Sequence, residues 1–293
     1  MIKPRIITSL LTKDQEFQVL QAADAERAVA RAGFDLELIY ARNNAPLQVE
    51  QLYRFIHAPA ATRPVAIVVQ AVSGDGLARV AHDAVAAGIG WVLLNRDPDY
   101  IDALRATHAK LPISVVTIDQ LAVGRIQGKQ FRSLLPKGGD VLYVRGPSDS
   151  SAAIQRLDGM QETIAGANIT VQTVSAEWTE VSGERAVQSW LRLSSSQAQK
   201  IDVVGAQNDA MAIGARKAIV ASRPEWERIP FTGCDGLVEG GQRLVNERML
   251  AATIVLQPAT GPAIDLVAAH LRHAKPAPRR IVLPARSYPT DVG

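Results

Sequence analysis

Apolar and polar residues follow two alternating patterns along this chain: short apolar runs and longer amphipathic runs. The run 65–69 is entirely apolar, which is typical of a strand buried on both faces of a parallel sheet. Residues 15–32 repeat apolar side chains at helical spacing, and Gly33 follows them where a helix would end. Strands that alternate with amphipathic helices predict an α/β fold with parallel sheets built from strand–helix–strand units.

This alternation continues to the end of the chain, with a restart near Asp119 and no long linker. The restart indicates two doubly wound lobes that are closely coupled. The predicted strands are 5–9, 36–40, 65–69, 91–94, 115–118, 140–145, 169–175, 201–205, 231–233, 251–255 and 281–283. The predicted helices are 15–32, 47–57, 77–87, 122–135, 152–165, 182–193, 209–220, 237–245 and 260–271.

Polar side chains follow three of the predicted strands at the point where each strand ends. Asn95 and Arg96 follow one strand, and Asn208 and Asp235 each follow another. In open α/β sheets, ligands bind outside the carboxyl ends of the strands. A hydroxyl both donates and accepts hydrogen bonds, so amide, guanidinium and carboxylate groups suit it well. These residue types therefore favour binding of a polyhydroxylated ligand over chemistry.

The bulk composition excludes several classes of function. The 293 residues include 32 basic and 29 acidic ones, a net charge of +3, without the basic stripe expected for phosphate-backbone binding. No nucleic-acid partner is therefore expected. No apolar run approaches the roughly 20 residues of a membrane-spanning helix. The single cysteine, Cys234, cannot form an intrachain disulfide.

The N-terminal residues 1–5 lead directly into a predicted strand and lack the apolar stretch of a signal peptide. Two alternatives follow from this. The chain is either the mature form of an exported, periplasmic protein or, if Met1 is the native start, a cytoplasmic one.

Side chains that could carry chemistry are few and scattered. His270 and His273 are one helical turn apart, but they belong to a basic helix end and are expected at the surface rather than at a metal. Cys234 has no histidine near it in sequence, so a small buried thiol is its expected role. The chain contains neither a phosphate-binding glycine loop nor a dinucleotide fingerprint. No catalytic residue, metal site or cofactor is therefore predicted.

A series of motifs occurs in a fixed order along the chain. They are Asn95–Arg96, Asp119, residues 151–159 (SAAIQRLDG), 207–215 (QNDAMAIGA), 233–236 (GCDG) and 250–254 (LAATI). Through these motifs the chain resembles the type I periplasmic binding proteins, particularly the ribose/galactose-type sugar-binding branch, over nearly its whole length. The repressors of the lac type share this core, so the resemblance specifies the fold more closely than the role.

The resemblance implies two doubly wound parallel-sheet lobes joined by three hinge crossings, with a ligand in the cleft and closure of the lobes around it. By analogy, residues 1–118 and 257–283 form the first lobe. Residues 119–256 and 284–293 form the second.

The resemblance also implies ligand-binding residues. Family positions that match are Arg96, Arg156, Asn208 and Asp235, with Asn95 beside the first of them. For two of these positions an alternative stays open. Arg156 could instead form a salt bridge on a helix surface, and Asp235 could instead cap the helix that follows.

Three further positions match less closely. Trp178 corresponds to an aromatic stacking position, although it could instead be a hydrophobic plug under a loop. Phe17 lies at the start of the first helix, where the family places aromatic contacts. Gln257 lies by the third crossing, one place after the family glutamine.

Two departures from the family pattern alter the expected ligand. Asn95 stands where ribose-type proteins carry Asp, and Cys234 stands where they carry Phe. The first change removes a negative charge, so Arg96 and Arg156 face one fewer carboxylate. The second removes a stacking ring and leaves room. A sugar derivative that bears a carboxylate or phosphate therefore becomes a candidate ligand.

The leading hypothesis is a non-enzymatic, monomeric substrate-binding protein of an ABC-type sugar transporter, with a membrane permease as its partner. The alternative is the ligand-sensing effector domain of a transcription regulator or signalling system, for which a dimer in solution would be expected. An enzyme that uses the same cleft is disfavoured, because the motifs supply no acid–base pair and no activated nucleophile.

Overall fold

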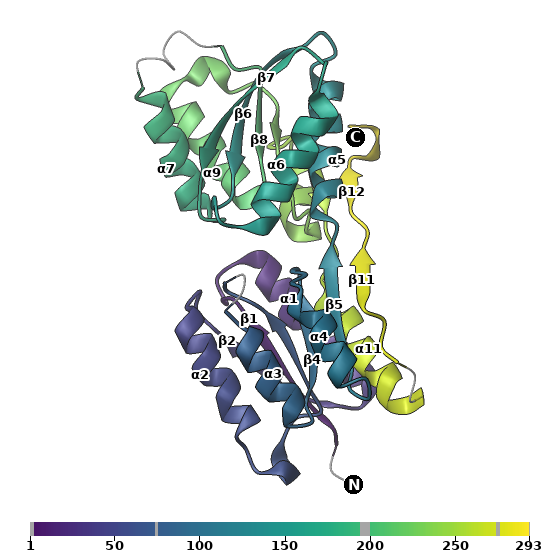
Figure 1. The fold of residues 1–293 in the computed structure, drawn as a ribbon. Helices are drawn as coiled ribbons and strands as arrows, with labels where there is room; N and C mark the ends of the chain where they lie inside the picture. Colours follow the sequence, from purple (N-terminus) through teal and green to yellow (C-terminus); the bar gives the residue numbers. More distant parts are fainter. Residues whose placement is uncertain (1–2, 74–75, 194–199, 274–275, 293) are drawn as a thin grey trace. The chain divides into compact units, whose positions relative to one another are not determined.

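The computed structural model describes residues 3–73, 76–193, 200–273 and 276–292, and the chain divides into two compact units (Figure 1). The first unit comprises Met1–Ile118 with Gln257–Leu283, and the second comprises Asp119–Leu256 with Pro284–Gly293. The chain therefore passes from one unit to the other after Ile118, after Leu256 and after Leu283. Each unit is built around a parallel sheet, which confirms the predicted α/β fold class.

The first unit contains one six-stranded sheet. Its strands are β1 (Arg5–Leu10), β2 (Asp35–Tyr40), β3 (Ala66–Gln70), β4 (Gly90–Leu94), β5 (Ile113–Ile118) and β11 (Arg280–Leu283). Its helices are α1 (Glu16–Ala32), α2 (Ala45–Ile56), α3 (Ala78–Ala86), α4 (Tyr100–Thr107) and α11 (Thr260–His273), with the 3₁₀ turn η1 (Ala60–Thr62). The strands are ordered β11-β5-β4-β3-β1-β2 and every neighbouring pair is parallel.

Helices cover both faces of this sheet. α2, α3 and α4 share a core with one face, and α1 and α11 pack together on the other (Figure 1). The central strands β3 and β4 are accordingly apolar, with Ile67, Val68 and Trp91 among their fully buried residues. In open α/β sheets, ligands bind outside the carboxyl ends of the strands, where the connections to the helices begin. Functional side chains of this unit are therefore expected on those connections.

The second unit contains a smaller parallel sheet and an antiparallel pair of strands. The parallel strands are β6 (Gly139–Arg145), β7 (Ile169–Ser175), β8 (Val203–Ala206) and β9 (Phe231–Thr232), in the order β7-β6-β8-β9. The antiparallel strands are β10 (Thr253–Val255) and β12 (Arg286–Tyr288). The helices are α5 (Gln120–Leu134), α6 (Ser151–Ile164), α7 (Glu180–Leu191), α9 (Asp209–Ser222) and α10 (Arg243–Asn246), with the shorter turns η2 (Pro224–Trp226), η3 (Val238–Gln242) and η4 (Thr290–Val292).

Side-chain caps fix where two helices of the second unit begin. The Asp119 carboxylate accepts a hydrogen bond from the Ala122 N–H at 2.9 Å and starts α5. The Asn208 side chain accepts one from the Met211 N–H at 2.9 Å and starts α9. Each cap satisfies a backbone donor that a helix end leaves without a partner.

α5 and α6 pack unusually closely because a glycine lies at their contact. A Cβ added at Gly124 would lie 2.1 Å from the backbone oxygen of Arg156. Only a residue without a side chain allows the two backbones to approach this far. The position of Arg156 on α6 is therefore set by backbone contact with α5.

Three elements differ from the sequence prediction. α4 was missing from it, since this helix has eight residues and buries only Ile101 and Leu104, which leaves a weak amphipathic pattern. β12 was also missing, because its three residues form a strand only by pairing with β10. The predicted continuous helix 237–245 is wrong, because a π-helical turn interrupted at Gly240 precedes the single turn α10.

Within the part of the chain that the structure describes, no helix combines the length and the apolar character that a membrane span would need.

Candidate functional site

Buried glutamine side chains fix the carboxyl edge of the first sheet. Gln48 donates from Nε2 to the Ser9 hydroxyl at 3.0 Å and to the Gln70 carbonyl at 2.8 Å, and its Oε1 accepts from the Val72 N–H at 3.0 Å. Gln18 donates to the Gln70 side chain at 3.2 Å. These bonds hold the segment that follows β3 in one conformation, because they satisfy its buried polar groups.

Arg96 lies against that segment. Its Nε donates to the Ala71 carbonyl at 3.3 Å and its Nη2 to the Val72 carbonyl at 3.4 Å, and the residue is half-buried. Both distances are long for hydrogen bonds of a guanidinium. The loop after β4 carries Arg96, and the carbonyls of Ala71 and Val72, which follow β3, fix the orientation of its side chain.

Asn95 begins the loop after β4 in a left-handed conformation, with φ of 58°. Its N–H donates to the Val116 carbonyl at 2.9 Å. Asparagine tolerates this conformation better than most residues. Its Oδ1 is buried and finds no hydrogen-bond donor among the described residues, so it is an unsatisfied acceptor.

The remaining two predicted residues of the first unit lie on different elements. Phe17 is partly buried in the first turn of α1, next to Gln18 of the glutamine network. Gln257 is exposed and is the first residue of this unit after the chain returns to it. The structure thus joins Arg96 to Ala71 and Val72 after β3, and Asn95 to Val116 of β5, whereas Phe17 and Gln257 lie on other elements.

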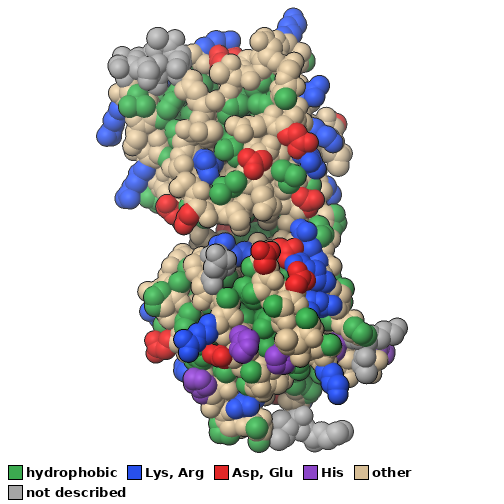
Figure 2. All heavy atoms as spheres, viewed as in Figure 1, with side chains coloured by type: hydrophobic (Ala, Val, Ile, Leu, Met, Phe, Trp, Pro, Cys, Tyr) green, Lys and Arg blue, Asp and Glu red, His purple; other side chains and the backbone are tan. Residues whose placement is uncertain are grey.

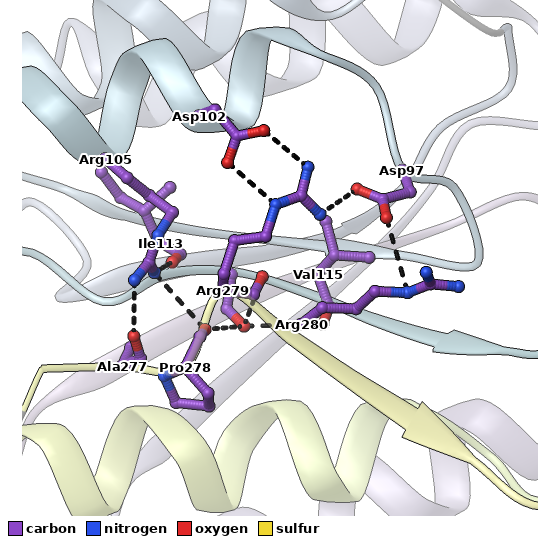
Figure 3. Close-up of polar contacts among 10 residues, drawn as sticks. Asp97, Asp102, Arg105, Ile113, Val115, Ala277, Pro278, Arg279 and Arg280 are labelled. Carbon is purple, nitrogen blue, oxygen red and sulfur yellow. Dashed lines mark hydrogen bonds and ion pairs between the residues drawn. The ribbon is translucent and has the colours of Figure 1, made fainter.

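An ion-pair network adjoins the loop that carries Arg96 (Figure 3). Arg279 donates to both oxygens of Asp102, at 2.8 and 2.9 Å, and its Nη1 pairs with Asp97. Arg280 approaches the second oxygen of Asp97 at 3.4 Å. The space-filling view shows adjoining acidic and basic side chains on the first unit, where Figure 1 places α4 and β11 (Figure 2). Both arginines are thus paired with acidic side chains, although they stay partly exposed, at 34% and 44%.

Arg156 of α6 is the most firmly held of the predicted residues. It is 6% exposed, its Nε donates to Gln120 Oε1 at 2.8 Å, and its Nη1 donates to the Gln207 carbonyl. Its guanidinium lies 5.7 Å from the ring centroid of Trp178, within cation–π range. Arg156 is therefore a buried arginine inside a polar network, and the alternative of a helix-surface salt bridge is wrong.

Trp178 and Asn208 lie beside Arg156. Trp178 is partly buried with φ of 61°, and its ring covers Gly146, where an added Cβ would lie 2.1 Å from the ring. The Asn208 Nδ2 donates to the Trp178 carbonyl at 3.0 Å, while its Oδ1 caps α9. The side chain of Asn208 thus orients Trp178, in addition to any contact that it makes with a ligand.

Asp235 lies in the loop after β9 with φ of 103°, and it is partly buried. The neighbouring Gly236 donates its N–H to Asp209 at 2.8 Å, and the same carboxylate accepts from the Thr253 hydroxyl at 2.6 Å. Asp209, which is 4% exposed, therefore ties the Asp235 loop to β10 from inside the unit. No side-chain bond caps η3, the next helical turn, so the alternative of a helix cap at Asp235 gains no support.

Burial governs the ionisation of two side chains near this group. Burial raises the pKa of the Cys234 thiol to about 12, although the positive charge of Arg156 acts in the opposite direction. Burial likewise raises the pKa of Tyr143 above its usual range, against the opposing charges of Arg156 and Arg145. Both groups are therefore neutral at physiological pH. A neutral, buried thiol is a poor nucleophile, which agrees with the role predicted for Cys234.

Arg145 is a residue that the sequence prediction missed. It is the last residue of β6, next to Gly146 beneath Trp178, and its charge acts on the same Tyr143 hydroxyl as that of Arg156. Its Nε is buried and has no acceptor within the described ranges. The available signal was its place at the end of a predicted strand, the same signal that identified Asn95 and Arg96.

Comparison with known proteins places the chain in a family. A family model described as a periplasmic binding protein domain matches residues 6–275. A putative rhizopine-binding protein of Rhizobium meliloti is 30% identical over 208 residues, which are 69% of this chain and 63% of that protein. A ribose import binding protein of Escherichia coli K12 is 24% identical over 260 residues, which are 88% of this chain and 81% of that protein. The match thus spans less than two thirds of the rhizopine-binding protein.

Solved structures share the fold over nearly the whole chain. A periplasmic solute-binding protein of an ABC transporter from Actinobacillus succinogenes 130z, with bound D-allose, has a TM-score of 0.84 at 21% identity and covers 99% of both chains. A Caulobacter myo-inositol binding protein has a TM-score of 0.81 at 21% identity, covering 97% of this chain and 92% of that one. At these identities the likeness shows the fold alone. The family match over residues 6–275, however, shows that the chain belongs to the periplasmic binding proteins, a family of non-enzymatic solute-binding proteins.

Proposed function

We propose that this chain captures a sugar or sugar derivative and presents it to the permease of an ABC transporter. The observation that carries the proposal is the placement of polar side chains at the carboxyl edge of each sheet. Arg96 and Asn95 lie there in the first unit, and Arg156 and Asp235 in the second. Planar groups with several donors or acceptors suit vicinal hydroxyls.

The proposed ligand carries an anionic group. Arg156 is held as a cation by neutral partners, a side-chain amide and a backbone carbonyl, and Arg145 presents a buried donor without an acceptor. Asn95 provides an acceptor but no negative charge. The carboxylate of Asp209 already accepts from a backbone amide and a hydroxyl. A ligand carboxylate or phosphate would supply an acceptor for the Nε of Arg145.

The cellular setting of the proposal follows from the relatives. The Escherichia coli relative is a ribose import binding protein, and its name implies a transporter as partner. By extension, this chain would act in the periplasm as a monomer. Phe17, Trp178, Asn208 and Gln257 remain proposed ligand contacts, with Trp178 as the stacking surface for a sugar ring.

A thermal-shift screen tests this function. The panel contains pentoses, hexoses and polyols, and each neutral sugar is paired with its acid or phosphate, for example D-galactose with D-galacturonate. A sugar at 100 times its Kd adds about 2.7 kcal/mol of stability, which raises Tm by several degrees. We expect the anionic member of a pair to give the larger shift.

Substitutions connect the shift to the site. Arg96→Ala and Asp235→Ala should abolish it, whereas Arg125→Ala should not, since Arg125 forms an exposed surface pair with Glu162 at 3.0 Å. A shift with neutral sugars alone would refute the proposal that the ligand is anionic, but it would support sugar binding. No shift with any member of the panel would refute sugar binding and turn attention to a sensor of another effector.

A further inference from the structure

We propose that Arg279 is a positioning residue that holds the loop carrying Arg96 in place from the start of β11. The loop comprises residues 95–99, between β4 and α4. That Arg96 binds a ligand rests on the proposed function. That Arg279 positions the loop rests on contacts within the first unit alone.

The first step concerns how the loop is attached. Its backbone is anchored at one end, where the Asn95 N–H donates to the Val116 carbonyl at 2.9 Å. Directly after Arg96, both oxygens of Asp97 are engaged, one by Arg279 and the other by Arg280 at 3.4 Å. The Asp97 carboxylate is thus the side-chain anchor closest to Arg96 along the chain.

The second step concerns the geometry of Arg279. Its Nε and Nη2 donate to the two oxygens of Asp102 at 2.8 and 2.9 Å, which is a bidentate pair with the first turn of α4. Its third nitrogen, Nη1, pairs with Asp97. Because the guanidinium is planar and rigid, a side chain already fixed on Asp102 presents Nη1 in a fixed direction. Arg279 therefore joins the loop to α4 through one ordered group.

The third step concerns the backbone segment that carries Arg279 (Figure 3). Arg105 of α4 donates to the Ala277 carbonyl at 2.9 Å, and the Ser114 hydroxyl donates to the Pro278 carbonyl at 2.7 Å. The Arg279 carbonyl accepts from the Val115 N–H at 3.0 Å. Each of the residues 277–279 therefore accepts a hydrogen bond from α4 or β5 through its backbone carbonyl.

The role of this network is positional because its groups are partly exposed. The side chains of Arg279 and Asp97 are 34% and 26% exposed, and ion pairs in water contribute little to global stability. The bonds from Arg96 to the carbonyls of Ala71 and Val72 are long, at 3.3 and 3.4 Å. Loosening the loop should therefore release Arg96 without unfolding the unit.

The test begins on the sugar-free protein, with two readouts at Arg96. Phenylglyoxal, which modifies accessible guanidinium groups, is followed at Arg96 by peptide mass spectrometry. Hydrogen exchange is followed in the peptide that spans residues 95–99. In Arg279→Met we expect both rates to rise about two- to fivefold, the equilibrium equivalent of a partly exposed ion pair. Arg125→Met, which removes the exposed bidentate pair with Glu162, is the matched control and should leave both rates unchanged.

Second variants keep the test decisive if Arg279→Met is unstable. Asp97→Asn removes the loop's anchor but leaves the pair between Arg279 and Asp102. It should raise the modification of Arg96 as much as Arg279→Met does. Arg279→Lys keeps the charge and should restore only part of the protection. Equal Arg96 rates in wild type, Arg279→Met and Asp97→Asn would overturn the proposal.

The final arm uses D-ribose and D-galacturonate as probes in a titration. If either binds to the wild type, Arg279→Met should weaken that probe about two- to fivefold, and Arg125→Met should not. An affinity that is unchanged in Arg279→Met, despite faster modification of Arg96, would overturn the link to ligand binding. If Arg96 is released but neither probe binds to the wild type, the positioning role stands and the proposed function loses support.

Discussion

The two arginines predicted to bind ligand, one in each unit, are held in opposite ways. Arg156 stands on a helix, is 6% exposed, and bonds to a buried glutamine and a backbone carbonyl. Arg96 stands on a loop, is half-buried, and rests on two carbonyls at 3.3 and 3.4 Å. Arg156 is thus buried in the second unit. Arg96 lies on a loop of the first unit, and ion pairs anchor that loop.

This difference determines what a substitution reports. Removing Arg156 changes folding as well as any contact with a ligand, because its partners are buried with it. Removing Arg96 takes away two long, part-buried bonds to carbonyls. The loop arginine is therefore the cleaner probe of binding, and the helix arginine the cleaner probe of how the second unit is packed.

The largest effect is expected where the backbone itself positions Arg156. Gly124→Ala would place a Cβ 2.1 Å from the Arg156 backbone oxygen, so α5 and α6 must move apart. We expect a loss of about 3 kcal/mol in the free energy of unfolding, measured by urea titration. Lys129→Ala, on the exposed side of the same helix, should change it by less than about 0.5 kcal/mol. Equal stability of the two variants would contradict the close contact of the helices.

The next largest effect is the difference in stability between variants of the two arginines. Arg156→Ala should lower the free energy of unfolding by about 2 kcal/mol, because the Gln120 side chain and the Gln207 carbonyl lose their donor in a buried place. Arg96→Ala should cost less than about 0.5 kcal/mol. Urea titration of both variants measures this contrast. A larger loss in Arg96→Ala than in Arg156→Ala would reverse the comparison.

A smaller effect is expected for the second unit at alkaline pH. The pKa of Cys234 is raised to about 12 by burial, so its neutral form favours the folded state. That contribution is complete below the unfolded thiol's pKa of about 8.5 and is lost as pH rises toward the folded value. Between pH 7 and pH 9.5, the wild type should lose about 1 kcal/mol more than Cys234→Ala. Parallel pH profiles of the two proteins in urea titrations would show that the thiol is not buried as described.

The smallest effect is expected for the first unit at acid pH. The hydrogen bonds from Arg279 lower the pKa of Asp102, so the ionised carboxylate favours the folded state. This contribution is present above the unfolded carboxyl's pKa and is lost as pH falls through the lowered folded value. The difference in Tm between wild type and Arg279→Met should therefore shrink below about pH 4. A difference that stays constant from pH 7 to pH 3 would exclude the ion pair as its origin.

Much of the fold could be predicted because its signals are local. The apolar run at 65–69 and the amphipathic segment 15–32 correspond to β3 and α1 within a residue or so at each end. Elements that depend on partners were not found. β12 forms only beside β10, and the helical pattern of residues 237–245 gives no sign of the non-helical backbone at Gly240.

Among the candidate site residues, too, local signals could be read from the sequence and distant partners could not. The ends of the predicted strands identified Asn95 and Arg96, because parallel strands bring their carboxyl ends to one edge. The same rule could have identified Arg145. Nothing in the sequence, however, pointed to Gln120 as the partner of Arg156 or to Arg279 as the partner of Asp97, since these pairs are 36 and 182 positions apart.

The sequence by itself determined the order of strands and helices, the α/β class and the family, since these follow from periodicity and short motifs that each reside in a few neighbouring residues. Only the tertiary structure decided which polar groups are buried, which are paired and which lack a partner. Burial and pairing depend on residues that are distant in sequence and adjacent only after folding. Arginine is therefore buried in a polar network at Arg156, lies on a loop at Arg96, and forms ion pairs that anchor that loop at Arg279.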